Sequence, residues 1–194
     1  MKVIGLTGGV GMGKSTAAGL LLQAGVRVVD TDELARKLVE PGQPALEQIR
    51  TKFGPGMISS AGELRRDELA CLVFADPAAR QKLEAILHPR IREMWQRQLE
   101  VWRSENCLLA AVVIPLLFET QAEGSFDKII CVACTPATQR ERLHARGWNT
   151  EQASHRIAAQ MPVEQKMARS HFVIWTEGLV ENHRQQIGEI LKRL

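Results

Sequence analysis

Residues 2–16, Lys2-Val-Ile-Gly-Leu-Thr-Gly-Gly-Val-Gly-Met-Gly-Lys-Ser-Thr16, decide the fold of this chain. The segment begins with Lys2–Thr7, whose apolar β-forming residues predict a short buried strand. A glycine-rich turn follows, and the leucines within Lys14–Ala24 then predict a helix. Within this strand, loop and helix, Gly8–Ser15 fits G-x-x-x-x-G-K-[ST] in full. The pattern and its context together indicate a loop that binds phosphate groups.

The residue types of the loop suit a polyphosphate. Glycines let the backbone curl, so that successive N–H groups and the helix N-terminus face the anion. Lys14 would place a charge on the β- and γ-phosphates, Ser15 would ligate Mg²⁺, and Thr16 would add a donor at the helix start. A glycine turn that only joined a strand to a helix would need neither lysine nor serine. The expected ATP-binding residues of the loop are Gly8, Gly9, Gly11, Met12, Gly13, Lys14, Ser15 and Thr16.

The loop implies ATP or GTP with Mg²⁺. The chain has no Asn-Lys-x-Asp motif of the kind that reads guanine, so GTP loses support. A buried strand that ends in the Asp of a motor-type ATPase is also missing, because Cys107–Ile114 runs into Pro115-Leu-Leu-Phe-Glu119. A small-molecule kinase that uses ATP and Mg²⁺ is the remaining interpretation.

A second short strand is expected at Val26–Val29, and two carboxylates follow it. Asp30 and Asp32 would stand at the carboxyl end of that strand, where open α/β sheets place their ligand crevice. Asp32 is then a candidate base or orienter for an attacking hydroxyl, and Asp30 a candidate carboxylate near the metal. The alternative is that one of them only N-caps the next helix. The sequence alone leaves both assignments open.

The rest of the chain alternates between helical and strand patterns. Helical periods fill 33–105, with a long amphipathic helix that starts at Asp76-Pro77 and contains Pro89. Continuous apolar β-formers at 107–114 and 128–134 predict strands buried on both faces of a parallel sheet. Further helices are expected at 136–146, 150–160 and 179–194, and a last strand at 172–175. The alternation indicates an α/β fold.

Composition excludes several classes of protein. The 194 residues are 45% hydrophobic and 24% charged, as in ordinary globular proteins, which argues against disorder and against a disulfide scaffold. The net charge of +3 suits anionic ligands, but the chain has no tyrosine and no basic runs interleaved with aromatics, so we expect no nucleic-acid partner. The longest uncharged stretch, 106–118, is too short to cross a membrane. No apolar stripe calls for a partner, which favours a monomer.

Targeting signals and cysteines point to the cytoplasm. Glycines interrupt the apolar N-terminus before the core of a signal peptide can form. Cys71, Cys107, Cys131 and Cys134 are then expected to be reduced thiols. The Cys131-x-x-Cys134 spacing can also mean zinc or redox chemistry, but it has no second pair and lies in an apolar strand pattern, which favours buried thiols.

Taken together, the motifs resemble those of the dephospho-CoA kinases, and the match spans nearly the whole chain. The resemblance rests on the glycine loop and on motifs whose order and spacing are specific to that family. These motifs are Val29-Asp-Thr-Asp32 with Ala35-Arg36, Val39-Glu-Pro-Gly42, His88-Pro89, Pro115-Leu-Leu-Phe-Glu119, Arg142-x-x-x-Arg146 and Ala158-Ala-Gln160.

The resemblance implies an architecture. It is the three-layer P-loop nucleoside-triphosphate-hydrolase fold, with a mostly parallel five-stranded sheet. One kinase domain would comprise a core of 1–32, 105–135 and 168–194, a helical acceptor-binding insertion at 33–104, and a helical lid at 136–167. The implied reaction is transfer of the ATP γ-phosphate to the ribose 3′-hydroxyl of dephospho-CoA.

The resemblance also assigns residues to the reaction. Lys14, Asp32 and Arg142 would be catalytic, with Asp32 taking the hydroxyl proton, and Arg142 and Arg146 would bind ATP from the lid. Arg142 and Arg146 are four residues apart and share a helix face, which suits phosphate binding, although a solvated basic face has the same pattern. The implied acceptor-binding residues are Asp32, Arg36, His88, Pro115, Leu116 and Glu119.

Some of these assignments keep an alternative. His88 in a long amphipathic helix is otherwise a packing or capping residue, and Glu119 is otherwise a charge at a helix start. Two departures from the family pattern also stand out. Met12 replaces a small residue, which we expect to matter little because loop side chains point away from the phosphates. His171 and Thr176 replace the usual Asp and Asn, which puts an adenine-side role for those positions in doubt.

Two rival functions remain at this point. One is a kinase of the same class that acts on a nucleoside, a nucleotide or shikimate. The other is a nucleotide-binding regulator that uses the loop as a switch or binds RNA.

Overall fold

The computed structural model describes all 194 residues and divides the chain into two compact units. The first unit comprises Met1–Asp30 and Leu99–Leu194, and the second comprises Thr31–Gln98. Neither unit contains a helix both long and apolar enough to cross a membrane.

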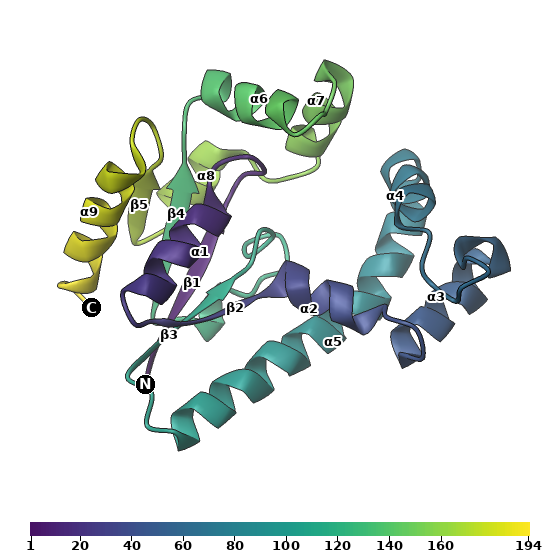
Figure 1. The fold of residues 1–194 in the computed structure, drawn as a ribbon, viewed down its shortest axis with the longest axis horizontal. Helices are drawn as coiled ribbons and strands as arrows, with labels where there is room; N and C mark the ends of the chain where they lie inside the picture. Colours follow the sequence, from purple (N-terminus) through teal and green to yellow (C-terminus); the bar gives the residue numbers. More distant parts are fainter. The chain divides into compact units, whose positions relative to one another are not determined.

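The first unit is built on five parallel strands in the order β2-β3-β1-β4-β5 (Figure 1). Because every pair is parallel, all five carboxyl ends lie at one edge of the sheet. The prediction of a mostly parallel five-stranded sheet is therefore confirmed. The strands are β1 (Lys2–Gly8), β2 (Arg27–Asp30), β3 (Leu109–Val113), β4 (Lys128–Ala133) and β5 (Phe172–Trp175).

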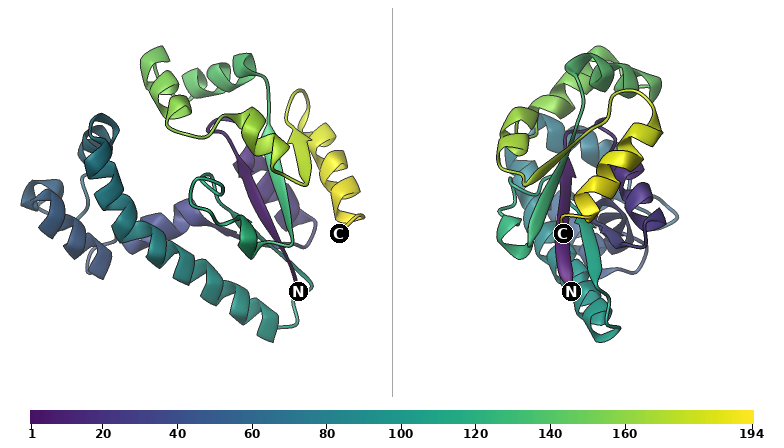
Figure 2. Two further views of the ribbon diagram at one scale, coloured as in Figure 1. Left: turned by 180° about the vertical axis from the view of Figure 1, so that it is seen from behind. Right: turned by 90° about the vertical axis from the view of Figure 1, so that its left-hand side faces the viewer.

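Helices cover both faces of this sheet and give three layers (Figure 2). α1 (Lys14–Gln23) and α9 (Val180–Leu191) pack on one face, where their apolar residues share a core with alternate residues of the strands. α8 (Val163–Ala168) contacts β1 and β4 from the opposite face. A Cβ at Gly5 would lie 2.6 Å from Leu117 Cδ1, so a glycine is required where the segment after β3 covers β1.

Two more helices lie beyond the carboxyl ends of the strands (Figures 1 and 2). α6 (Pro136–Ala145) begins directly after β4, and the Thr135 side chain accepts a hydrogen bond from the Thr138 N–H as its N-cap. α7 (Thr150–Ala158) begins with a capping box between Asn149 and Gln152. These local signals explain why the helices expected at 136–146 and 150–160 form where the sequence predicts them.

The second unit is helical and has its own core. It contains α2 (Thr31–Leu38), α3 (Pro44–Phe53), the short 3₁₀ helix η1 (Pro55–Met57), α4 (Arg66–Ala75) and most of α5 (Pro77–Ser104). α5 starts as predicted, with the Asp76 carboxylate accepting a hydrogen bond from Ala78 N at 2.8 Å. Val39, Leu46, Ile49, Leu69 and Ile86 form the centre of the buried cluster.

The structure adds elements that the sequence did not predict. α8 has six residues, too few for a helical period to be recognised. A second short 3₁₀ helix, η2 (Glu123–Ser125), lies between β3 and β4. β3 spans Leu109–Val113, shorter than the expected 107–114.

Candidate phosphate-binding and catalytic site

The glycine loop joins β1 to α1 at the carboxyl edge of the sheet. Gly8, Gly11 and Gly13 all have positive φ values, of 145°, 75° and 93°. Gly13 is the N-cap of α1 and makes no side-chain cap hydrogen bond, and the first turn of α1 has no acidic residue. The N–H groups of that turn therefore keep their capacity to bind an anion.

Gly8 has no room for a side chain. A Cβ at this position would lie 2.3 Å from the Val132 carbonyl oxygen of β4. The loop consequently leaves the sheet in close contact with the neighbouring strand, which fixes the path of the backbone toward the phosphate site. Gly13 has more space, because its nearest neighbour would be the Thr176 side chain at 3.4 Å.

Lys14 folds back over the loop. Its Nζ donates hydrogen bonds to the carbonyl oxygens of Gly8 and Gly9, each at 2.9 Å. Ser15 and Thr16 follow in the first turn of α1 and are exposed. The structure thus gathers a cation, two hydroxyls and the helix N-terminus around one loop, the set that triphosphate binding requires.

The Met12 side chain is only 2% exposed and packs with Ala133 and Cys134, against Val163 and Met167. These partners come from β4, the residue after it, and α8. Met12 therefore anchors the loop to β4 and α8. The sequence analysis expected this side chain to matter little. Its side chain fills the space that a small residue would leave.

The two carboxylates after β2 take different positions. α2 begins at Thr31, so Asp30 directly precedes the helix at its N-cap position, while Asp32 lies in the first turn and is exposed. Asp30 ends a strand that pairs with β3, and β3 pairs with β1. At roughly 4.8 Å per strand spacing, Asp30 lies about 10 Å across the sheet from Leu6 of β1.

Oxygen donors for a metal are few. No group of three or more His, Cys, Asp and Glu side chains gathers to hold a metal ion. Mg²⁺ typically takes one or two protein ligands and completes its shell with water and substrate phosphates. The hydroxyl of Ser15 and the carboxylate of Asp30 therefore fit an ion that binds together with a nucleotide.

The two arginines predicted for the lid differ in their surroundings. Arg142, in α6, donates to Thr176 through Nη1 to Oγ1 at 2.9 Å and through Nη2 to the carbonyl oxygen at 2.5 Å. Arg146 caps the C-terminus of α6 and is exposed. Arg142 is thus oriented by a residue that follows β5, whereas Arg146 faces solvent.

Two glutamines that the sequence analysis did not single out hold the tip of the loop. Gln139 Nε2 donates to the Val10 carbonyl oxygen at 2.7 Å, and Gln160 Oε1 accepts from Val10 N at 2.9 Å. The first glutamine comes from α6 and the second follows α7. Both polar groups of the Val10 backbone are therefore satisfied by the segment expected to be the lid. The only sequence signal was the place of Gln160 in a family motif.

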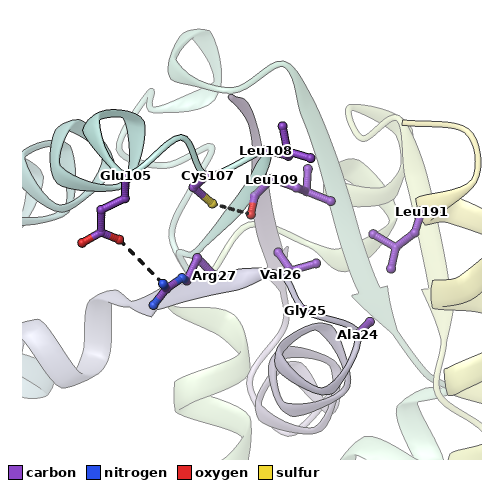
Figure 3. A pocket seen from close by; sticks show the side chains of 9 residues that line it. All are labelled: Ala24, Gly25, Val26, Arg27, Glu105, Cys107, Leu108, Leu109 and Leu191. Carbon is purple, nitrogen blue, oxygen red and sulfur yellow. Dashed lines mark hydrogen bonds and ion pairs between the residues drawn. The ribbon is translucent and has the colours of Figure 1, made fainter.

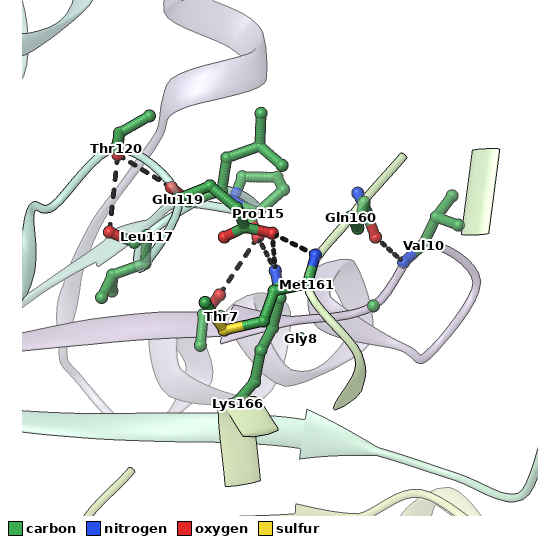
Figure 4. Close-up of polar contacts among 12 residues, drawn as sticks. Thr7, Gly8, Val10, Pro115, Leu117, Glu119, Thr120, Gln160, Met161 and Lys166 are labelled. Atoms are coloured by element: carbon green, nitrogen blue, oxygen red, sulfur yellow. Dashed lines mark hydrogen bonds and ion pairs between the residues drawn. The ribbon is translucent and has the colours of Figure 1, made fainter. Parts of the chain in front are cut away.

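The loop after β3 contains three predicted acceptor-binding residues. Pro115 and Leu116 are half-buried. Glu119 Oε1 accepts a hydrogen bond from Met161 N and forms an ion pair with Lys166, both at 2.8 Å (Figure 4). Glu119 is thus bound to other parts of the first unit, and Lys166 is a buried charged residue that sequence analysis missed.

Arg36 and His88 belong to the second unit. Arg36 is exposed in α2, and His88 lies half-buried in α5. Burial lowers the pKa of His88; Glu84 raises it and Arg92 lowers it by smaller amounts. His88 is therefore held mainly in its neutral form near pH 7.

His171 and Thr176 lie at opposite ends of β5. Thr176 follows the carboxyl end of the strand and donates to the carbonyl oxygens of Met12 and Ala133. His171 precedes the strand, and its Nδ1 accepts a hydrogen bond from Ile129 N at 3.0 Å. Thr176 thus contacts the glycine loop, whereas His171 binds the first residues of β4 at the amino edge of the sheet.

The cysteines show no sign of a metal or redox centre. All four are free thiols, and both Cys131 and Cys134 are buried. Burial raises the pKa of Cys131 to about 11 and also raises that of Cys134. These thiols are therefore poor nucleophiles and poor metal ligands at neutral pH.

A separate cavity lies at the other edge of the sheet (Figure 3). Its lining includes Arg27 and Leu109, the first residues of β2 and β3, and the Arg27–Glu105 ion pair crosses part of it at 3.6 Å. Open α/β sheets bind ligands at the carboxyl ends of their strands, so this cavity is not the candidate site.

Comparison with known proteins agrees with the geometry. The model of the family described as dephospho-CoA kinase matches residues 2–182. A dephospho-CoA kinase of Bdellovibrio bacteriovorus is 40% identical over 194 residues, covering 100% of this chain and 96% of the relative. One of Anaeromyxobacter dehalogenans is 44% identical over 182 residues, covering 93% of this chain and 86% of the relative.

A solved structure is similar over its whole length. A crystal structure of a protein from Thermus thermophilus superposes with a TM-score of 0.85 at 36% identity, covering 100% of this chain and 97% of that chain. The glycine loop, its lysine and the parallel sheet thus occur together in a chain that a family model matches almost from end to end. The chain belongs to the dephospho-CoA kinase family.

Proposed function

We propose that this chain transfers the γ-phosphate of ATP to the 3′-hydroxyl of dephospho-CoA, giving CoA and ADP. The observation that carries the proposal is the glycine loop, with Lys14 folded over it and an uncapped helix N-terminus behind it, in a member of this family. The loop N–H groups and the Lys14 ammonium bind the β- and γ-phosphates. A bound Mg²⁺, held by Ser15 and with Asp30 nearby, would neutralise charge on these phosphates.

Asp32 is the residue that we assign to the acceptor hydroxyl. It lies exposed in the first turn of α2, directly after the edge strand β2. In this assignment its carboxylate orients the hydroxyl for in-line attack and takes the proton as the new P–O bond forms.

Four further residues are assigned to the acceptor in this proposal. Arg36 provides a charge for phosphate groups of dephospho-CoA, and Pro115 and Leu116 provide half-buried apolar contacts. Because burial lowers the pKa of His88, this side chain binds the acceptor as a neutral hydrogen-bonding group. Glu119 acts indirectly, through its contacts with Met161 and Lys166.

Within the proposed lid region 136–167, α6 and α7 serve as the lid, since α8 packs on the sheet. Arg142 and Arg146 stabilise the charge that spreads over the transferring phosphoryl group, and closure excludes water that would otherwise hydrolyse ATP. Gln139 and Gln160 already join this segment to the tip of the loop. The four free thiols suit the reducing cytoplasm as the place of action.

A screen of acceptors tests the proposal. ADP release by the purified chain with Mg²⁺-ATP is measured with dephospho-CoA, a nucleoside, a nucleotide and shikimate, and products are identified by mass spectrometry. We expect rapid ADP release only with dephospho-CoA, with one added phosphoryl group. Faster release with another acceptor would reassign the substrate. ATP binding with no acceptor-stimulated release would favour a regulator instead.

A further inference from the structure

Lys166 is a fully buried lysine in α8, with 0% of its side chain exposed. Its Nζ donates to the Pro115 carbonyl oxygen at 2.6 Å and lies 2.8 Å from Glu119 Oε1 (Figure 4). Both partners belong to the loop after β3. One buried cation thus binds this loop at two points.

The same loop is bound from two further directions. Thr7 Oγ1, in β1 just before the glycine loop, donates to the Pro115 carbonyl oxygen at 3.2 Å. Met161 N, in the connector between α7 and α8, donates to Glu119 Oε1 at 2.8 Å. The loop after β3 is therefore joined to β1, to the connector and to α8.

The connector continues these contacts to the donor loop. Gln160, next to Met161, accepts the hydrogen bond from Val10 N at 2.9 Å. A continuous set of polar contacts thus leads from the tip of the glycine loop, through residues 160–161, to Glu119 and Lys166 (Figure 4). We call this set the buried bridge.

Stability does not account for the ion pair in the buried bridge. Removing two charges from water costs about as much as their attraction returns, and apolar replacements of buried pairs are often neutral or stabilising. Glu119 Oε2 is, in addition, buried without a hydrogen-bond partner, which is a further cost. The ion pair instead fixes the geometry of the loop, because the charge of Lys166 and the charge of Glu119 are neutralised only when the two side chains are in contact.

We propose that Glu119, Lys166 and Gln160 are positioning residues for phosphoryl transfer, which fix the loop after β3 relative to the glycine loop. This inference rests on the proposed function, in which Pro115 and Leu116 contact the acceptor and the glycine loop holds the donor. In-line transfer is sensitive to misplacement of the reacting groups by about 1 Å. Loosening the bridge therefore lowers turnover while each substrate site persists.

A set of four proteins separates positioning from stability: wild type, Lys166→Met, Glu119→Leu and the double variant. Glu119→Leu leaves the fully buried Lys166 cation without its carboxylate partner, so its melting temperature falls strongly. Lys166→Met leaves Glu119, which is 22% exposed, and lowers the melting temperature less. The double variant has no buried charge and regains most of the wild-type melting temperature. We expect its kcat with dephospho-CoA to fall at least tenfold and its KM for dephospho-CoA to rise. Its Mg²⁺-ATP affinity, measured without acceptor, changes less than threefold.

A neighbouring ion pair provides the matched control. Arg169, just after α8, pairs with Glu123, which follows the loop after β3, and their side chains are 43% and 34% exposed. Glu123 Oε2, like Glu119 Oε2, is buried without a hydrogen-bond partner, but Glu123→Gln leaves only Arg169, which is 43% exposed, without its charged partner. We expect its turnover and melting temperature to stay close to those of the wild type.

Gln160 provides a test that does not depend on the buried charges. Gln160→Glu retains an oxygen that accepts from Val10 N, whereas Gln160→Met does not. We expect Gln160→Met to lower kcat several-fold and Gln160→Glu to retain more of it, with both proteins folded. If the double variant does not regain the wild-type melting temperature, the comparison of the two Gln160 variants tests the positioning role instead.

Two results would overturn the inference. One is a double variant that melts like the wild type and turns over at the wild-type rate. The other is a folded Gln160→Met protein with wild-type kcat. If the wild type itself does not phosphorylate dephospho-CoA, the proposed function fails instead, and the assay reveals this before any variant is compared.

Discussion

Arg142 is bound to Thr176 by two hydrogen bonds, one to the hydroxyl at 2.9 Å and one to the main-chain carbonyl at 2.5 Å. Thr176 in turn donates to the carbonyl oxygen of Met12 at 3.0 Å and is 1% exposed. One buried hydroxyl therefore connects an arginine of α6 with the backbone of the glycine loop. The position at which the family usually has Asn is thus filled by a residue with a clear structural role.

Replacement of Thr176 by valine removes this hydroxyl without a change of shape. The Met12 carbonyl loses one partner and Arg142 keeps only one of its two contacts, so we expect a loss of about 1–3 kcal/mol of stability. For a chain of this size the melting temperature would fall by roughly 2–12 °C. Turnover falls as well, because Arg142 is then oriented by one hydrogen bond instead of two. Thr176→Ser, which retains the hydroxyl, is the control; equal effects of the two substitutions would refute this account.

Substitution of Lys14 by methionine removes the charge that we assign to the β- and γ-phosphates. We expect kcat/KM to fall by a factor of roughly 10² or more, from loss of charge stabilisation in the transition state. The carbonyl oxygens of Gly8 and Gly9 lose the Lys14 donor, so we expect the melting temperature to fall by a few degrees. Steady-state kinetics and calorimetry on the same protein check both expectations. A variant with wild-type kcat/KM would remove Lys14 from the site.

Asp32→Asn tests the base assignment. The amide has the same shape but cannot take a proton, so we expect kcat to fall by orders of magnitude while Mg²⁺-ATP affinity stays the same. Calorimetric titration with nucleotide and turnover with dephospho-CoA separate these two properties. Asp30→Asn is the matched comparison, and there we expect weaker dependence on Mg²⁺ instead. Near-normal turnover of Asp32→Asn would exclude it as the base.

Gly8→Ala tests the close contact between the loop and β4. Its Cβ would lie 2.3 Å from the Val132 carbonyl oxygen, so backbone must shift, and we expect a loss of at least about 3 kcal/mol or no folded protein. Gly25→Ala is the control, since Gly25 also has positive φ but no atom within 4 Å of the added Cβ. The strained backbone alone should cost about 1–2 kcal/mol there. Denaturant unfolding compares the two, and similar losses would contradict the assignment of a clash.

Glu177 is expected to make folding sensitive to acid. Its carboxylate accepts hydrogen bonds from Thr135 N and from Thr138 Oγ1, which lower its pKa below the usual 4.5. Because the folded-state pKa is the lower one, this stabilisation is present above about pH 4.5 and is lost as the pH falls through the folded value. Glu177→Gln should therefore melt below the wild type at pH 7, with a gap that narrows below pH 4.5. A gap that does not vary with pH would contradict the assignment.

The local parts of the fold were predictable from the sequence. The strand, loop and helix at the N-terminus follow from apolar runs and glycines close together in sequence. The starts of α5 and α6 follow from Asp76 and Thr135, which each precede a proline at the first helical position. The type of site, a phosphate-binding loop, was also predictable, because its defining residues Gly8–Ser15 are contiguous in the sequence.

The long-range parts were not predictable from one sequence. The order of the strands depends on contacts between segments far apart in the chain, such as Gly8 with Val132. Lys166 follows two polar residues, and a lysine in such a segment is expected on a solvent-exposed helix face. In the structure, however, its side chain is buried in the core. Thr176 and Gln139 gained their roles only through partners more than thirty and a hundred residues away, respectively.

The position of Lys14 over its own loop bears on selectivity among anions. Its ammonium group donates to two carbonyl oxygens, so a phosphate that takes either of these hydrogens must replace an existing contact. Inorganic phosphate, with a single group, offers little to replace them. A triphosphate reaches the loop amides, the lysine and the helix end at once, and the sum of these contacts outweighs the exchange. The arrangement around Lys14 therefore favours a nucleoside triphosphate over small anions with a single phosphate group.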